Sequence, residues 1–318
     1  MNIKVRVFPF LLAAAVVCTA CDKPRRIPRI EPLLHGWSEA YRGRPGLTLH
    51  IFDTGSLSLP SGALYKGGSW AVPRDLVASA FVIEHPQAGL LVFDTGLSPM
   101  LRTDPVGYVG WFMGNLGRFN APEGADLPSQ MRAAGLEPDE VSRVVVSHLH
   151  FDHTGTMEAF PNATAVVSSE EKKAAAAAPW MQDYFVGGDY NSIDDWMEID
   201  YSKAAAFATF IAHHDLLGDG SVILVDLRGH TAGSQGMLLM MEGSPVLLTG
   251  DAAWVEENWR YAAIPSMAYD MDLWWEQIWR IKKFVQLVPD ALIVAGHDLT
   301  TARRGDRTDV VLYERGGD

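Results

Sequence analysis

Three histidines and one aspartate fall within the nine-residue stretch SHLHFDHTG, residues 147–155. The stretch directly follows the apolar run RVVV, which is typical of a buried strand. In an extended segment alternate side chains point the same way, so His148 and His150 would face one point. Asp152 and His153 follow where the chain must turn, and would face a second point nearby. The pattern fits either ordinary polar loop residues or two incomplete metal sites.

Three later segments offer the ligands that such metal sites would still need. His230 in RGHTAGSQG, Asp251 in LTGDAAW and His297 in VAGHDL each follow a short apolar run. A third histidine would complete each metal site, and a carboxylate would bridge the two metal ions. Imidazole and carboxylate are ligands that Zn²⁺ accepts where thiolates are absent. One such residue alone is usually a hydrogen-bonded surface or core group, but the combination indicates a catalytic metal site.

Cysteine usage excludes several other kinds of site. The chain has two cysteines, Cys18 and Cys21, so residues 22–318 contain none. A disulfide framework, a thiolate metal site and a cysteine nucleophile are therefore excluded from that part of the chain. No GxSxG elbow, P-loop or GxGxxG motif stands where its fold would require it. Any metal must be held by histidine and carboxylate.

Residues 1–21 differ in composition from the rest of the chain. Two basic residues precede an apolar stretch of eleven residues at 7–17, and small residues lead to Cys21. Because ~20 apolar residues are needed to cross a bilayer, this segment is predicted to be a signal peptide. It resembles a bacterial lipoprotein signal, with cleavage before Cys21 and lipid on its sulfur. Simple secretion after cleavage at Ala20 is the alternative.

The predicted destination is the periplasmic side of a bacterial membrane, as a lipoprotein or as a soluble periplasmic protein. Residues 22–45 contain four prolines and are predicted to form a linker or arm. Residues 46–318 are predicted to form a single domain that contains all the candidate metal ligands. The net charge is −13, which argues against nucleic acid as a partner because such binding needs clustered Lys and Arg. Membrane contact is expected through the lipid anchor only, and the sequence leaves the oligomeric state open.

Strands and helices alternate along the domain in an order that places polar residues at strand ends. Helices are predicted at residues 128–135 and 272–288, the second because its apolar residues recur at helical spacing. The pair His213 and His214 is predicted to lie in a solvated turn. The predicted strands cover residues 47–55, 76–85, 89–96, 141–150, 221–230, 235–241, 244–251 and 290–298.

The motif HLHFDHTG matches the HxHxDH signature of the metallo-β-lactamase superfamily, and the chain resembles this superfamily from about Leu47 to Thr300. Asp94 in DTG, His230 in GHTAG, Asp251 in TGD and His297 in GHD follow in the family's order. The resemblance implies an αββα sandwich, with two mixed sheets flanked by helices and a two-metal site between the halves.

The resemblance also implies roles for individual residues. The ligands of the two divalent metal ions, expected to be Zn, would be His148, His150, Asp152, His153, His230, Asp251 and His297. Asp94 would orient a ligand histidine. Asp152 would also be catalytic, holding the proton of a bridging hydroxide that attacks the substrate carbonyl.

Within the superfamily the chain looks most like N-acyl homoserine lactonases, on the phrases FDTG, SHLHFDHTG, GHTAGSQ and GHD. The predicted substrate is therefore a lactone or related small ester. A periplasmic β-lactam or thioester hydrolase on the same site is one alternative, and a metal-binding lipoprotein without turnover is another. The apolar segment GYVGWFMGNLGRF, residues 107–119, is predicted to be a mobile loop at the mouth of the site.

One position departs from the lactonase pattern. Lactonases of this type carry a tyrosine three residues after the bridging aspartate, where it helps to polarise the lactone carbonyl or the leaving oxygen. Trp254 occupies that position here. The candidates to replace the missing hydroxyl are Tyr184, Tyr190, Tyr261 and Tyr269, and the sequence does not choose among them.

Overall fold

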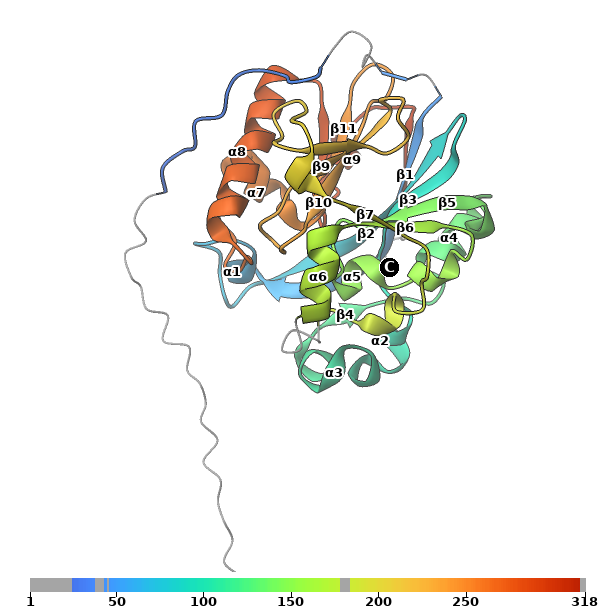
Figure 1. The fold of residues 1–318 in the computed structure, drawn as a ribbon. Coiled ribbons are helices and arrows are strands. Elements are labelled where there is room, and N and C mark those ends of the chain that lie inside the picture. The colour runs from blue at the N-terminus through green and yellow to red at the C-terminus, as the bar shows by residue number, and fades with distance from the viewer. Residues whose placement is uncertain (1–24, 38–42, 45, 178–183, 315–318) are drawn as a thin grey trace, which may run out of the picture.

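Two β-sheets lie face to face, with helices on their outer faces, in a computed structural model of the chain (Figure 1). The structure describes residues 25–37, 43–44, 46–177 and 184–314. The predicted signal peptide and the predicted lipidation site Cys21 lie outside these described residues. Their roles, and with them the predicted export of the protein, remain predictions.

The first sheet is mixed and contains the strands that lead to the HxHxDH motif. Its order is β13-β1-β2-β3-β5-β6-β7, and β4 pairs with β1. The pairs among β1, β2 and β3 are antiparallel, whereas β3, β5, β6 and β7 run parallel. The bounds are β1 (Thr48–Pro60), β2 (Pro73–His85), β3 (Gly89–Thr95), β4 (Phe119–Asn120), β5 (Val141–Val145), β6 (Thr164–Ser168), β7 (Trp196–Ile199) and β13 (Val310–Tyr313).

The second sheet has the order β12-β11-β10-β9-β8 and is also mixed, because β11 and β12 are parallel while the other pairs are antiparallel. His213 and His214 lie in its edge strand, where they pair with β9, so the prediction of a solvated turn was wrong. The bounds are β8 (His213–Asp215), β9 (Val222–Asp226), β10 (Gln235–Leu239), β11 (Val246–Leu248) and β12 (Leu292–Val294).

Helices fill the connections between strands. The two helices predicted from the sequence are confirmed as α4 and α8. The α-helices are α1 (Ser61–Leu64), α2 (Met100–Thr103), α3 (Pro105–Leu116), α4 (Leu127–Ala133), α5 (Phe151–Thr154), α6 (Ser169–Ala177), α7 (Glu256–Tyr261), α8 (Met271–Leu287) and α9 (Thr300–Arg304). Short 3₁₀ turns are η2 (Pro138–Glu140), η3 (Met157–Ala159), η5 (Gly187–Asp189), η6 (Tyr201–Lys203) and η7 (Gly250–Ala252).

The alternation of side-chain direction along the strands explains how the sheets and helices pack in layers. In β9, Val222 and Leu224 join the core between the two sheets, whereas Ile223 and Val225 face the other way and pack with α8. Successive side chains of a strand point to opposite faces, so a strand buried on both faces must be apolar throughout. The apolar stripe of α8, which includes Ile281 and other buried residues, covers that outer face.

The first sheet is built in the same way. Phe81 and Ile83 of β2 point into the core between the sheets, and Ala80 and Val82 point outward. The outward residues pack with α4, whose Leu127 is fully buried. Helix, sheet, sheet and helix therefore follow one another in layers. This arrangement confirms the αββα sandwich (Figure 1).

The segment before the domain lies against the second sheet and its helix. Trp275 of α8 donates its indole N–H to the carbonyl oxygen of Arg26 at 2.9 Å. His35 and Ala208 exchange two backbone hydrogen bonds, and the amide of Arg44 donates to Met240. Within the described ranges, none of the helices is both long enough and apolar enough to span a bilayer.

The prediction of a mobile loop at residues 107–119 was wrong about its secondary structure. Most of this segment belongs to α3, which begins at Pro105 and carries a kink at Gly110 (φ 81°, ψ 170°). Asp104 caps the helix by accepting a hydrogen bond from the Gly107 amide at 2.9 Å, and proline suits the first helical turn. Only glycine adopts the Gly110 conformation without strain, so the apolar segment stays helical on both sides of the kink.

A buried carboxylate attaches α3 to the helix that carries the motif. Asp189 accepts hydrogen bonds from the hydroxyl of Tyr108 in α3 at 2.6 Å and from that of Thr154 in α5 at 2.9 Å. Burial raises the pKa of Asp189 from 3.8 to about 7, although the two hydroxyl donors oppose this shift. The carboxylate therefore connects the α3 segment to the HxHxDH motif.

The linkage at Asp189 predicts a specific pH dependence of stability. Between about pH 4 and about pH 7 the folded protein holds a proton on Asp189 that the unfolded chain has released, so this group's contribution to the free energy of unfolding falls as pH rises. Asp189→Asn keeps an oxygen acceptor but cannot ionise. Urea unfolding should show the variant gaining stability relative to the wild type from about pH 5 to about pH 8. A difference that does not change with pH would contradict the linkage.

Candidate metal centre

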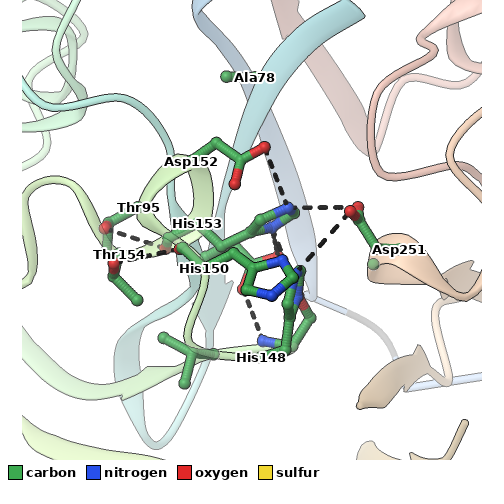
Figure 2. Close-up of polar contacts among 12 residues, drawn as sticks. Ala78, Thr95, His148, His150, Asp152, His153, Thr154 and Asp251 are labelled. Carbon is green, nitrogen blue, oxygen red and sulfur yellow. Dashed lines mark hydrogen bonds and ion pairs between the residues drawn. The ribbon is translucent and has the colours of Figure 1, made fainter. Parts of the chain in front are cut away.

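The seven side chains predicted as metal ligands meet at one place. Figure 2 shows His148, His150, Asp152, His153 and Asp251 of this set. Four come from the loop after β5 and from α5. The other three come from the second half of the chain, after β9, in η7 after β11, and after β12. Six of the seven are buried, and the side chain of the seventh, His230, is only 10% exposed. Residues more than a hundred positions apart in the chain are thus brought together by the two sheets.

The donor atoms form three groups, and the group of His148, His153 and Asp251 shares one histidine with each of the other two. His148, His150 and His230 make one group, and Asp152, His153 and His297 make another, with the donor atoms of each group within 4.8 Å of one another. His230 Nε2 lies 3.3 Å from His150 Nδ1, and His297 Nε2 lies 3.5 Å from an oxygen of Asp152. Each group contains three residues, which leaves room for a further ligand at each position.

Asp251 lies between the two groups. Its Oδ2 is 3.3 Å from His230 Nε2 and 3.9 Å from His148 Nε2. Its Oδ1 is 3.2 Å from His153 Nε2 and 3.1 Å from His297 Nε2. Each carboxylate oxygen therefore faces a different group, which is the arrangement that a bridging ligand requires.

Hydrogen bonds on the outer side of the rings orient them. His153 donates Nδ1–H to Asp94 at 2.8 Å, and His297 donates Nδ1–H to the carbonyl oxygen of Val77 at 2.9 Å. His148 Nδ1 lies 3.0 Å from the hydroxyl oxygen of Ser147. In each ring Nδ1 is occupied, so Nε2 carries the lone pair that faces inward. Asp94 is placed as the family resemblance implied.

Ser147 is a functional residue that the motif analysis did not single out. Its amide and its hydroxyl both donate to the carboxylate of Asp94, at 2.6 and 2.8 Å. Asp94 itself has a left-handed backbone (φ 56°), a conformation that aspartate tolerates better than most residues. The only sequence signal for Ser147 was its position between the apolar strand and the first histidine.

Buried polar atoms without partners test whether metal ions fit this site. His148 Nε2, His150 Nε2, His153 Nε2 and Asp251 Oδ1 are buried and have no hydrogen-bond partner. Buried polar groups are nearly always paired, so such a cluster indicates an absent partner. Among the described residues, the carboxylates of the site, Asp94, Asp152 and Asp251, form ion pairs with histidines and none with a lysine or arginine. The donor set therefore fits divalent metal ions.

The pKa values of the histidines divide along the same groups. Burial, and then the neighbouring histidines, hold the pKa of His148 well below its usual range, and burial also lowers the pKa of His150 and His230. Burial, the largest single influence, would likewise lower the pKa of His153 and His297, but the neighbouring carboxylates of Asp251 and Asp152, joined by Asp94 at His153, together raise the pKa of both. Bound metal ions would displace protons from this second group, so binding should release protons.

The four tyrosines left open by the sequence differ in position. The ring centre of Tyr184 lies 5.5 Å from that of His150. Tyr190 lines a cavity beside the site, whereas Tyr261 and Tyr269 are each 70% exposed. Trp254, at the position where lactonases have tyrosine, is buried with its ring 5.4 Å from that of His230.

A cavity of about 850 Å³ lies near His150, although none of the seven predicted ligands lines it. Leu149, between His148 and His150 in the chain, forms part of its wall, and Phe185, whose ring centre is 5.0 Å from that of His150, forms another part. Tyr108 and Gly110 of α3 also line it, so the apolar segment lies at this cavity as a helix, and its role at the mouth of the site stays a prediction. The cavity is large enough for a drug-sized ligand.

Known proteins resemble this chain over most of its length. The chain matches the metallo-β-lactamase superfamily over residues 73–297. It is 29% identical over 264 residues to N-acyl homoserine lactonase AttM of Agrobacterium fabrum, covering 79% of this chain and 93% of the relative. It is 27% identical over 234 residues to an N-acyl homoserine lactonase of a Bacillus species, covering 72% of this chain and 84% of the relative.

A solved structure shares the fold. It is an N-acyl homoserine lactone hydrolase with N-hexanoyl-L-homoserine bound at its catalytic metal centre, and it superposes with a TM-score of 0.68 at 23% identity, covering 82% of this chain and 97% of that one. The family match spans both halves of the site, from β2 to His297. The chain therefore belongs to the metallo-β-lactamase superfamily and is a metal-dependent hydrolase.

Proposed function

We propose that the protein opens lactone rings, with N-acyl homoserine lactones as its substrates, and that it does so with two divalent metal ions. The observation that carries the proposal is the position of Asp251, with one carboxylate oxygen toward each group of histidines. The lactonase activity named for the relatives supports the choice of substrate. We propose zinc as the metal because its preferred ligands are histidine and carboxylate when no cysteine is present.

The seven convergent residues would hold the metals, with His148, His150 and His230 at one ion, Asp152, His153 and His297 at the other, and Asp251 between them. Two divalent ions, when bound, supply Lewis-acid chemistry and lower the pKa of water toward ~7. Side chains of the protein would then position the attacking hydroxide and its proton. The Asp152 carboxylate, near His297, would hold the proton of the attacking hydroxide.

The substrate would lie between the metal site and the neighbouring cavity. The lactone carbonyl would face the histidines, and the apolar part of the substrate would lie against Leu149 and Phe185 in the cavity wall. Burial of the site excludes bulk water, which strengthens the electrostatic interactions that stabilise the developing oxyanion. Asp94 and the Val77 carbonyl would keep the His153 and His297 rings in place during the reaction.

We further propose that Tyr184 supplies the hydroxyl that the Trp254 position lacks. Of the four tyrosines considered, Tyr184 has its ring beside a histidine of the site. From there its hydroxyl would donate to the carbonyl or leaving oxygen as negative charge develops. Trp254 beside His230 contributes a buried ring but no hydroxyl.

A substrate panel tests the proposed function. The purified full-length protein, stripped of metal and reloaded with Zn²⁺, should hydrolyse N-acyl homoserine lactones with a higher kcat/KM than a cephalosporin or an acyl thioester, by at least roughly a hundredfold. The stripped protein is the control and should be inactive. Preference for the β-lactam or the thioester would replace the lactone assignment, and bound metal without any turnover would favour a metal-binding lipoprotein.

The role of Tyr184 is tested separately. Tyr184→Phe should lower kcat for lactones by on the order of a hundredfold, with a much smaller effect on KM, because the hydroxyl acts mainly on the transition state. Tyr261→Phe removes a hydroxyl from a side chain that is 70% exposed and should leave kcat unchanged. An unchanged kcat in Tyr184→Phe would exclude this hydroxyl from the reaction.

A further inference from the structure

One further buried carboxylate lies close to the loops that carry the histidines but takes no part in the proposed reaction. Glu171, in the first turn of α6, is 0% exposed. Its Oε1 accepts a hydrogen bond from the amide of Leu149 at 3.1 Å, and its Oε2 accepts one from the amide of Gly233 at 3.0 Å. Both carboxylate oxygens are therefore used to hold backbone from two distant parts of the chain.

The start of α6 explains why this glutamate turns inward. Ser168 and Glu171 have the spacing of a capping box, and the Ser168 hydroxyl oxygen accepts a hydrogen bond from the Glu171 amide at 3.1 Å. In that motif the glutamate ordinarily bonds back to the backbone amide of the capping residue. Here its carboxylate accepts instead from Leu149 and Gly233, so the helix start is attached to the two loops.

Those two amides belong to the loops that carry one group of histidines. Leu149 lies between His148 and His150, and Gly233 follows His230. The Gly233 peptide is held on both sides, because its carbonyl oxygen also accepts a hydrogen bond from the Ser168 hydroxyl at 2.7 Å. A Cβ at Gly233 would lie 2.2 Å from the Glu171 nitrogen, so only glycine allows this close approach.

We propose that Glu171 is a positioning residue that holds the two loops at the spacing one metal ion needs. This inference rests on the two-metal site proposed above, but not on the identity of the substrate. By fixing the backbone beside His148, His150 and His230, the carboxylate sets where their three nitrogen atoms meet. Outer groups of this kind typically change metal affinity by about 10- to 100-fold when they are removed.

The contacts of Glu171 are confined to one of the two groups. The rings of His153 and His297 are oriented from the other side of the site, by Asp94 and by the Val77 carbonyl. Gln235 of β10 also connects the second sheet to the HxHxDH loop. Its amide N–H donates to the carbonyl oxygen of Ser147, and its side chain donates to that of Val146. Loss of Glu171 should therefore affect the two metal ions unequally, whereas a general loss of packing would weaken both.

Glu171→Gln is the matched substitution because it keeps the shape of the side chain. An amide offers one acceptor where the carboxylate offers two, so one of the two backbone N–H groups loses its partner. Zn²⁺ is titrated into the full-length metal-free protein, and a competing chromophoric chelator reports how much is bound. The wild-type titration should show two binding steps, one for each metal ion. In Glu171→Gln one step should weaken by about 10- to 100-fold while the other stays unchanged.

Glu170→Gln is the control. Glu170 is the neighbouring glutamate on α6, and it forms an exposed ion pair with Lys173 at 3.1 Å. The substitution makes the same change in charge on the solvent side of the helix, so both binding steps should match those of the wild type. The urea midpoints of the metal-free wild type and of both variants are measured alongside, so that a change in binding is separated from a change in folding.

Two results would overturn the inference. One is a Glu171→Gln variant that binds both ions as tightly as the wild type does, and the other is an equal loss in both steps. If Glu171→Gln fails to fold, Ser168→Ala removes the hydrogen bond to the Gly233 carbonyl and should weaken the same single step by a smaller factor; no weakening there also overturns it. A wild type without two steps refutes the proposed two-metal site, and the inference with it.

Discussion

The arrangement of this protein depends on one buried carboxylate placed between two groups of histidines. Asp251 has contacts of 3.1–3.3 Å with His153 and His297 through one oxygen and with His230 through the other. Buried imidazole lone pairs and carboxylates packed this closely repel one another unless cations or protons lie between them. The need for positive charge at this point explains both the raised pKa of His153 and the fit to divalent metals.

The two sheets bring the ends of four strands together at the site. The apolar strands are buried on both faces, and the polar residues follow where each apolar run ends. Asp94, at the end of β3, orients His153, and the loop with His230 is attached to the loop of His148 and His150 through Glu171 of α6. Side chains that touch no substrate thus determine how closely the donor atoms approach one another.

Much of the site could be predicted from the sequence because metal ligation requires specific side chains at specific spacings. The HxHxDH motif, His230, Asp251 and His297 all lie where the pattern placed them, and Asp94 contacts a histidine as expected. The α3 segment was predicted less well, because its glycines and aromatic residues suit a loop as well as a kinked helix. Ser147 and Glu171 escaped prediction because their importance lies in contacts made only after folding.

Metal content, measured on the wild type and on Asp251→Asn in parallel, tests the central claim most directly. After loading and dialysis, elemental analysis of the full-length wild type should find about two metal ions per chain. Asp251→Asn keeps the shape of the side chain but removes the charge that two cations share, so its content should fall toward about one. Circular dichroism confirms that both proteins are folded. A wild type with almost no bound metal, or an Asp251→Asn variant that still holds both ions, would contradict the bridging role of Asp251.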